Sequence, residues 1–351
     1  MRNDAYGTGE HVKLLDVRDL HVHFHTFEGT AKVLEGITFS LEPGDTLGLV
    51  GESGCGKSVT AQTIIGLLPR PPAEVVAGEI WFEGENLLRK TAVQMRAIRG
   101  KRISMVFQDP MSYLNPVFTI GEQLVDVVLM HRGNGIHGAA DAVTKRLWHP
   151  QEVRLARDIA ADLLRQANIP QPELRLDHYP HEFSGGMRQR VLLAMGLAGQ
   201  PRLLLADEPT TALDVTIQAQ ILRLLAGLVE RQGISVLLIS HDLGVVSRLC
   251  RRVAVMYAGT IVESADVKPL FRNPLHPYTQ GLLLSIPRHA RRQEALVGIP
   301  GTIPNLITPP RGCRFHPRCP KAMAICREVK PAAVQIEPGH TVSCHLYLAG
   351  T

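Results

Sequence analysis

The stretch Gly51-Glu-Ser-Gly-Cys-Gly-Lys-Ser58 lies between two apolar runs, Thr46-Leu-Gly-Leu-Val50 and the segment from Val59 to Leu68. It fits the pattern G-x-x-x-x-G-K-[ST], and its flanks predict a buried strand before it and a helix after it. Glycines let successive backbone N–H groups turn toward a phosphate chain without side-chain clashes, and a helix N-terminus adds partial positive charge. The sequence therefore predicts a phosphate-binding loop (P-loop) at this position.

The residue types of this loop suit a nucleotide with its magnesium ion. Lys57 is a point charge that can reach the β- and γ-phosphates, and the Ser58 hydroxyl can bind Mg²⁺. The residues that we expect to contact the nucleotide here are Gly51, Ser53, Gly54, Cys55, Gly56, Lys57, Ser58 and Val59.

A second element, Leu203-Leu-Leu-Ala-Asp-Glu208, reads as a buried strand that ends in two carboxylates. The carboxyl ends of parallel strands face the crevice in which α/β proteins bind their ligands. We expect Asp207 to hold Mg²⁺ through water and Glu208 to act as general base toward the attacking water.

Strand-like and helix-like segments alternate along much of the chain, which predicts an α/β fold with a parallel sheet covered on both faces. Residues 111–200 instead show helical periodicity and predict an inserted helical subdomain. We expect a nucleotide-binding domain at residues 12–265. Residues 266–351 are rich in proline and predict a small, irregular C-terminal domain.

The chain has 351 residues, 45% of them hydrophobic and 20% charged, with a net charge of +5. These values exclude a disordered chain and a coiled coil. The positive charge is mild and spread out, so we expect no nucleic-acid partner. No apolar run reaches the ~20 residues of a membrane span, and Met1 to Glu10 is too polar for a signal peptide. We therefore expect a cytoplasmic chain unless another protein holds it at a membrane.

Phe183-Ser-Gly-Gly-Met-Arg-Gln189 resembles the signature motif of ATP-binding cassette (ABC) ATPases, usually written L-S-G-G-Q. The family's other landmarks stand on both sides of it in their expected order. The resemblance implies a P-loop NTPase core that hydrolyses ATP, with catalytic residues Glu208, His241 and Gln108 and magnesium ligands Ser58, Gln108 and Asp207. It also implies nucleotide contacts from Asp214 in the D-loop Thr211-Ala-Leu-Asp214, and from Phe24, an aromatic residue that stacks on adenine, with Phe27 as its rival.

In this family the signature faces the γ-phosphate of ATP bound to the other subunit, so the resemblance assigns Ser184, Gly185 and Gly186 to a partner's nucleotide. Met187 and Phe183 depart from the usual Gln and Leu, but neither change removes a backbone donor. The helical block is also longer than usual near residues 133–153, and no role is assigned to that insertion.

Several longer segments resemble the ATPase subunits of bacterial dipeptide and oligopeptide importers. They are Tyr179 to Arg190, Ala206 to Gln220, Asn273 to Leu283 and Gly312 to Pro320. This resemblance implies a peptide transporter at the cytoplasmic face of the cell membrane. Its partners would be a second, paralogous ATPase, two membrane permeases and an extracytoplasmic substrate-binding protein, with a coupling helix received near Gln108 to Thr119.

Four of the six cysteines fall within the last 39 residues: Cys313, Cys319, Cys326 and Cys344. In a cytosolic chain such a group favours metal over disulfides, and soft thiolates suit Zn²⁺ or a [4Fe–4S] cluster. The importer resemblance implies the [4Fe–4S] cluster, with zinc or reduced thiols as alternatives.

Two other functions compete with peptide import. One is a soluble cassette ATPase of DNA repair or translation, although such chains usually carry two cassettes or nucleic-acid-binding insertions. The other is an importer of another solute, such as nickel, glutathione or a sugar, which this sequence hardly distinguishes from a peptide importer.

Overall fold

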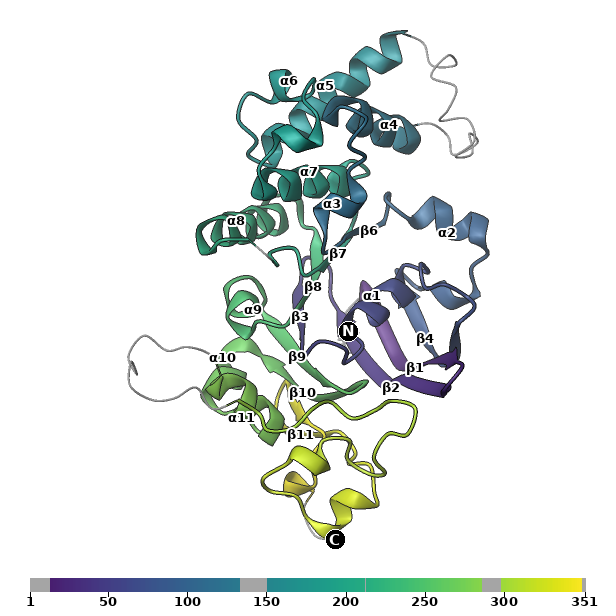
Figure 1. Cartoon of the computed structure of the whole chain (residues 1–351), viewed down its shortest axis with the longest axis vertical. Helices are drawn as coiled ribbons and strands as arrows, with labels where there is room; N and C mark the ends of the chain where they lie inside the picture. Colours follow the sequence, from purple (N-terminus) through teal and green to yellow (C-terminus); the bar gives the residue numbers. More distant parts are fainter. Residues whose placement is uncertain (1–12, 133–149, 212, 286–297, 349–351) are drawn as a thin grey trace, which may run out of the picture.

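The computed structural model describes residues 13–132, 150–211, 213–285 and 298–348. The molecule is elongated. A helical block lies at one end, a sheet-centred core in the middle and the C-terminal segment at the other end (Figure 1). The P-loop follows the central strand β3 (Thr46–Val50), in the middle of the molecule.

The core sheet contains eight strands in the order β11-β12-β10-β9-β3-β8-β7-β6, and five adjacent strands of it are parallel. Short apolar runs form these five strands because a parallel sheet is buried on both faces. Besides β3 they are β6 (Ile103–Val106), β7 (Leu203–Asp207), β8 (Ser235–Ser240) and β9 (Arg252–Tyr257). This arrangement confirms the predicted α/β fold.

Two features depart from a wholly parallel sheet. The N-terminal strands form a separate antiparallel sheet in the order β2-β1-β4-β5, and three strands at one edge of the core sheet are antiparallel. The N-terminal strands are β1 (Leu15–Thr26), β2 (Gly29–Leu41), β4 (Ala73–Phe82) and β5 (Glu85–Asn86). The edge strands are β10 (Thr260–Asp266), β11 (Val334–Glu337) and β12 (His340–Val342). Alternation of apolar residues does not by itself reveal strand direction, so the sequence did not separate these strands from the parallel ones.

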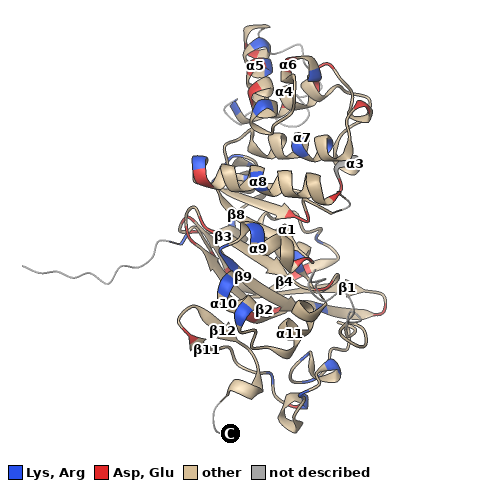
Figure 2. Ribbon diagram, turned by 90° about the vertical axis from the view of Figure 1, so that its left-hand side faces the viewer, with Lys and Arg blue, Asp and Glu red and all other residues tan. Residues whose placement is uncertain are grey.

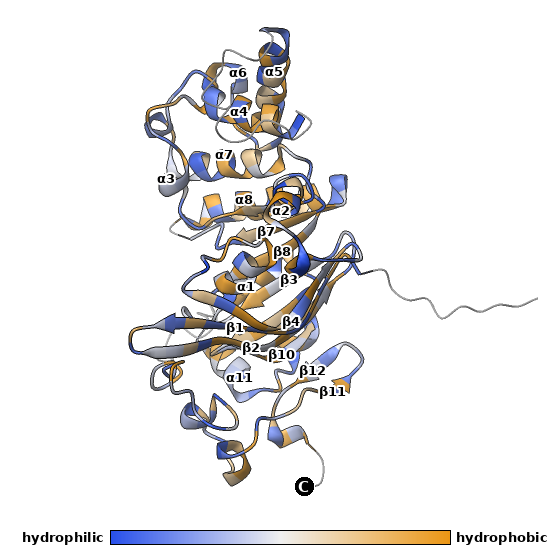
Figure 3. Ribbon diagram, turned by 90° about the vertical axis from the view of Figure 1, so that its right-hand side faces the viewer, coloured by the Kyte–Doolittle hydropathy of each residue, from blue (hydrophilic) through white to orange (hydrophobic). Residues whose placement is uncertain are grey.

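Helices cover both faces of the core sheet, and alternate residues of β8 show the two sides. Val236 and Leu238 join the hydrophobic cluster that continues into the helical block, whereas Leu237 and Ile239 join the cluster beneath the antiparallel sheet. Hydrophobic colouring therefore concentrates on the central strands (Figure 3). The covering helices include α1 (Lys57–Ile64), α8 (Val215–Gln232) and α9 (Leu243–Leu249), and α2 (Ala92–Ile98) adds Met95 and Ile98 to the cluster beneath the antiparallel sheet.

The helical block joins β6 to β7. It contains α3 (Pro110–Tyr113), α4 (Ile120–Arg132), α5 (Pro150–Gln166), α6 (Pro172–Arg175) and α7 (Gly185–Leu197), with a 3-10 turn at Pro180–Glu182. Most of the predicted insertion near 133–153 lies outside the described residues, and its last residues begin α5.

The C-terminal segment packs against the core and extends its sheet, since β12 pairs with β10. Its remaining elements are α10 (Val267–Arg272), α11 (Pro277–Leu284) and 3-10 turns at His316–Arg318, Ala324–Arg327 and His345–Tyr347. Tyr257, Tyr278 and Phe315 pack together with ring centroids 4.7–5.4 Å apart, so aromatic contacts join the core to this segment.

Charged residues are scattered over all three parts of the molecule (Figure 2). In the part of the chain that the structure describes, no helix combines the length and the apolar character that crossing a bilayer requires.

Candidate functional site

The P-loop runs from β3 to α1 in a conformation that two glycines make possible. A Cβ on Gly51 would lie 2.1 Å from the Met256 carbonyl oxygen. Gly56 has a φ of +102° where it caps α1, and a Cβ there would clash with Leu34. Larger residues would therefore displace the loop from the sheet or distort its backbone.

The Lys57 ammonium is buried and fixed by the loop itself. It donates hydrogen bonds to the carbonyl oxygens of Gly51 at 2.7 Å and of Glu52 at 3.0 Å. Burial raises the pKa of the neighbouring Cys55 thiol, which keeps it protonated and consistent with a small filler. The lysine charge thus lies inside the loop, where a phosphate chain would meet it.

Ser58 and Asp207 meet beside the P-loop. Ser58 lies in the first turn of α1, which follows β3, and Asp207 ends β7, and these two strands lie on either side of β8. The Ser58 hydroxyl donates to Asp207 Oδ1 at 3.0 Å. Burial, together with the nearby Glu208 charge, raises the pKa of Asp207, although the Ser58 hydrogen bond and Lys57 oppose this shift. A hydroxyl and a buried carboxylate are oxygen donors that suit Mg²⁺, and a cation there would favour the charged carboxylate.

Glu208 is held by three side chains from three different loops. Gln108 Nε2 and Thr211 Oγ1 each donate to its Oε2 at 2.8 Å, and His241 Nδ1 lies 3.2 Å from its Oε1. Its backbone has a φ of +45°, and its N–H donates to the Ile239 carbonyl oxygen at 3.0 Å. The end of β7 therefore aims this carboxylate at the glutamine and the histidine that the sequence predicted.

The signature and D-loop residues occupy helix N-termini in the adjoining helices. Ser184 caps α7, where its hydroxyl accepts from the Met187 N–H, and Asp214 caps α8 by accepting from the Ile217 N–H at 2.9 Å. A Cβ on Gly186 would approach the Ile217 side chain to 2.4 Å, so this glycine lets α7 and α8 pack closely. Ala212 of the D-loop lies outside the described residues.

No hydrogen bond or ion pair among the described residues joins Ser184, Gly185 or Gly186 to the P-loop. The structure of one chain therefore does not bring the signature to its own nucleotide site.

The two candidate aromatic residues lie in different environments. Phe24 is partly buried and packs against the hydrophobic cluster beneath the antiparallel sheet, whereas Phe27 is fully exposed in the turn between β1 and β2. The structure distinguishes the packing of the two rings, and the choice between them as the adenine contact stays a prediction.

The four C-terminal cysteines come together in one small region, where their charges influence one another's titration. Burial raises the pKa of Cys313 to about 11, and it also raises the pKa of Cys319 and of Cys344. In each case a backbone N–H group two residues further along the chain opposes this rise in pKa. Such donors suit thiolate ligands.

Among the residues that the structure describes, however, no three His, Cys, Asp or Glu side chains are placed to hold a metal ion. The donor set therefore fits a soft metal, but the expected [4Fe–4S] site is not assembled in this structure.

Three functional contacts were not anticipated. Thr211 joins the partners of Glu208, and its place in the D-loop, three residues after the base, was the available signal. Glu52 inside the P-loop pairs with Arg318, 266 residues away in sequence, and its backbone N–H donates to the Tyr278 hydroxyl at 2.9 Å.

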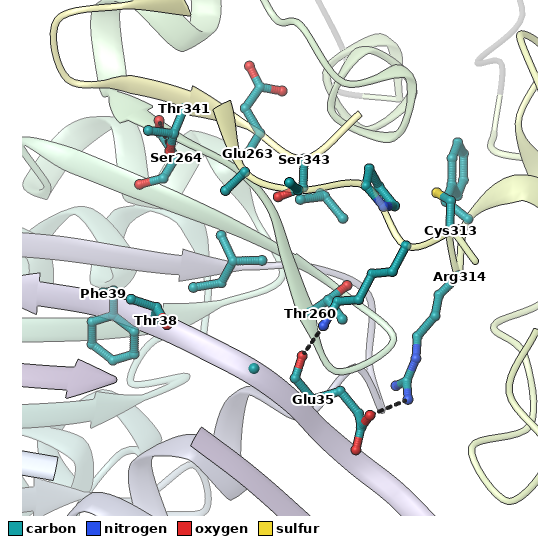
Figure 4. Close-up of a pocket in the computed structure, with 18 of the residues that line it drawn as sticks. Glu35, Thr38, Phe39, Thr260, Glu263, Ser264, Cys313, Arg314, Thr341 and Ser343 are labelled. Carbon is teal, nitrogen blue, oxygen red and sulfur yellow. Dashed lines mark hydrogen bonds and ion pairs between the residues drawn. The ribbon is translucent and has the colours of Figure 1, made fainter. Parts of the chain in front are cut away.

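A cavity of about 800 Å³ lies between β2, β10 and the C-terminal segment (Figure 4). At its edge, Glu35 contacts two cations of that segment: its carbonyl oxygen accepts from Lys330 at 3.0 Å, and its carboxylate lies 4.0 Å from Arg314. Burial opposes ionisation of Glu35, but the His23 hydrogen bond and the Arg314 charge hold its pKa below the ordinary value. Among the described residues lining it, Cys313 is the only predicted site residue.

Comparisons with known proteins agree with this geometry. Residues 34–211 match the family model described as ABC transporter, and residues 262–326 match the oligopeptide/dipeptide transporter C-terminal region. A probable peptide ABC transporter ATP-binding protein of Sinorhizobium fredii is 52% identical over 94% of each chain. The dipeptide transport ATP-binding protein of Bacillus subtilis is 47% identical over 95% of each chain.

Among solved structures, a dimeric bacterial ABC transporter cassette superposes with a TM-score of 0.60 at 25% identity. That match covers 72% of the present chain and 98% of the cassette.

Proposed function

Because this chain belongs to the family of ATP-binding subunits of peptide ABC transporters, we propose that Glu208, Asp207, Ser58 and Lys57 form its ATP-hydrolysing site. The chain is an ATPase subunit that powers peptide import. The contact between the Ser58 hydroxyl and Asp207, next to the three-partner setting of Glu208, is the observation that carries the assignment.

Each residue has a distinct role in this proposal. The P-loop N–H groups and Lys57 bind the phosphates, and Ser58 and Asp207 hold Mg²⁺, which draws charge from the phosphate oxygens when bound. Glu208 accepts a proton from the attacking water, and Gln108 and His241 keep its carboxylate aimed at that water. Gln108 can also bind the ion through its amide oxygen.

The signature completes the site of a second ATPase subunit. Ser184, Gly185 and Gly186 begin α7, and the backbone N–H groups of a helix N-terminus attract anions. Among the described residues they form no hydrogen bond or ion pair with the chain's own P-loop, which supports a role in contacting a partner's γ-phosphate. Asp214 and an aromatic residue of the β1–β2 hairpin, Phe24 or Phe27, complete the nucleotide contacts.

The proposed transporter also contains two membrane permeases, a paralogous ATPase and an extracytoplasmic substrate-binding protein, and this subunit acts at the cytoplasmic face of the membrane. Three large apolar side chains between Gln108 and Thr119 support a permease contact there: Tyr113, Val117 and Phe118 are all exposed. ATP drives closure of the paired ATPases because it binds the closed state more tightly.

The chain divides, in this proposal, into a nucleotide-binding domain at residues 12–265, with its helical subdomain at about 111–200, and a C-terminal domain at 266–351. The four-cysteine group of the latter binds a [4Fe–4S] cluster, with zinc or free thiols as the alternatives. The clustered thiols and their backbone N–H donors support a metal; the absence of an assembled ligand set among the described residues argues against it.

The proposed site is tested with Glu208→Gln in the full chain, alongside the wild type. Binding of MgATP should persist while hydrolysis is lost, because the amide keeps the shape of the side chain but cannot accept the proton. Undiminished hydrolysis would remove Glu208 from the role of base.

The partners and the cysteine group are tested by affinity purification from membranes without oxygen. We expect permeases and a second ATPase in the eluate, and a broad absorption near ~400 nm if iron and sulfide are bound. A colourless eluate with the same partners would leave zinc or free thiols, whereas ribosomes or DNA-repair factors would contradict the transporter assignment.

A further inference from the structure

The P-loop contains an acidic residue at a position where its charge is unfavourable. Glu52 directly follows Gly51 in the loop, and its carbonyl oxygen accepts from the Lys57 ammonium at 3.0 Å. A carboxylate within a few ångströms of a phosphate site repels the polyanion that the site must bind. In this structure Arg318 compensates the charge.

Arg318 belongs to the turn immediately before Cys319. Its two terminal nitrogens donate hydrogen bonds to the Glu52 carboxylate, at 2.7 and 3.1 Å. Its side chain is only 6% exposed. Such a two-point pair is well defined in geometry, and in a site shielded from water it is screened less than a surface pair.

The guanidinium is held in place by other groups as well. It donates to the carbonyl oxygens of Ile299 and Pro300, lies 3.4 Å from the Tyr257 hydroxyl and stacks on the Tyr257 ring. Together with the two bonds to Glu52, these contacts use all five N–H groups of the arginine. The C-terminal segment therefore presents Arg318 to the P-loop in one fixed position.

The same segment also holds the backbone of Glu52. The buried Tyr278 hydroxyl accepts the Glu52 N–H at 2.9 Å, and Tyr278 packs against Phe315, close to Arg318 in sequence. The side chain, the N–H and the carbonyl oxygen of one P-loop residue are thus each fixed by a separate partner.

We propose that Arg318 is a positioning residue of the nucleotide site, through which the C-terminal segment holds and neutralises Glu52 so that the P-loop can accept a polyphosphate. This inference rests on the proposed function, since it presupposes that the loop binds ATP. It gives the C-terminal segment a role in nucleotide affinity that is independent of what the cysteines bind.

The test compares the MgATP dissociation constant of the full chain in four variants: Arg318→Gln, Glu52→Gln, the double variant and Arg327→Gln. Arg327 is the matched control because it is exposed and directly follows Cys326, as Arg318 directly precedes Cys319. Arg318→Gln should weaken binding about tenfold, the order expected for one uncompensated like charge at close range. Glu52→Gln and the double variant should both bind within about threefold of wild type, because neither leaves the carboxylate unpaired.

Three results separate the possible failures. Binding by Arg318→Gln that matches Arg327→Gln would overturn the inference. A double variant as weak as Arg318→Gln would also overturn it, because the arginine would then act only by supporting the fold, which thermal unfolding without nucleotide would reveal. A wild-type chain that binds no MgATP would instead contradict the proposed function.

Discussion

Two glutamates of the core sheet, one directly after β7 and one within β10, each have three polar partners, but the partners differ in kind. Glu208, after β7, is met by side chains of Gln108, Thr211 and His241, and the histidine is half exposed. Glu263, in β10, is completely buried and accepts from the backbone N–H groups of Leu275 and His276 and from the His340 ring.

The difference suits Glu208 to its proposed reaction and Glu263 to holding the fold together. Partners on exposed side chains can rotate away when substrate and water arrive, whereas backbone donors and a buried ring cannot. A site for chemistry therefore keeps its carboxylate accessible. A contact between two segments, such as the one that Glu263 makes with Leu275, His276 and His340 (the junction), fixes its carboxylate on every side.

The largest expected effect concerns the first carboxylate. Glu208→Gln should lower the rate of ATP hydrolysis by about 10²–10⁴-fold, the usual contribution of a general base. Its midpoint of urea unfolding should stay near that of wild type, because rotatable side-chain donors can adjust to the amide. If Glu208→Gln also clearly lowered the midpoint of urea unfolding, Glu208 would be needed for the fold as well, and the contrast with Glu263 would fail.

For the second carboxylate the same substitution should act on stability. Glu263→Gln should lower the free energy of unfolding by about 1–3 kcal/mol, because the amide has one acceptor oxygen where the carboxylate has two, and at least one buried donor then faces its NH₂ group. Equilibrium urea unfolding measures this change, with Glu208→Gln as the matched control. A loss below about 1 kcal/mol would show that the junction tolerates an unpaired donor.

The junction should also be sensitive to acid through His276. Burial lowers the pKa of its ring from 6.5 to about 3, and the neutral Nδ1 accepts from the Tyr278 N–H at 3.1 Å. A base with a lowered folded pKa contributes stability that is complete above pH 6.5 and is lost as the pH falls from 6.5 toward 3.

The His276→Asn variant keeps an acceptor at this helix N-terminus but cannot titrate. Between pH 6 and 4 it should lose less stability than wild type, by about 1.4 kcal/mol per pH unit, as followed by urea unfolding at each pH. Parallel pH profiles for the two proteins would remove His276 from the acid response.

The smallest effect tests whether Asp214, a carboxylate close to the proposed catalytic residues, acts as a helix cap or through its charge. Asp214 caps α8, so Asp214→Ala should lower the free energy of unfolding by about 1 kcal/mol, whereas Asp214→Asn, which retains a capping oxygen, should cost much less. Thermal unfolding compares the two. Because both variants lack the charge and only the asparagine keeps the cap, a loss of ATP hydrolysis in Asp214→Asn would reflect the charge and not the helix cap.

The sequence predicted which side chains the structure brings together around Glu208 because each of these parts is local. A glycine-rich turn, a strand ending in Asp207 and Glu208, and a histidine after β8 each carry their own pattern, and parallel strands bring their ends together.

The pairs that join the C-terminal segment to the core could not be predicted in the same way. The pairs Glu52–Arg318 and Glu263–His340 join residues 266 and 77 positions apart, and neither residue of a pair carries a local pattern that points to the other. The four C-terminal cysteines differ from these pairs. Their grouping was clear from the sequence, but tertiary packing sets where their sulfur atoms lie.

The pairing of β12 with β10 has a consequence for the solubility of shortened chains. An unpaired edge strand presents a row of free N–H and C=O groups, which invites pairing with another molecule. In the intact chain β12 and β11 lie along that side of β10. A chain cut just before residue 334 would uncover it, so such a truncation would favour self-association and aggregation even if its P-loop still bound ATP.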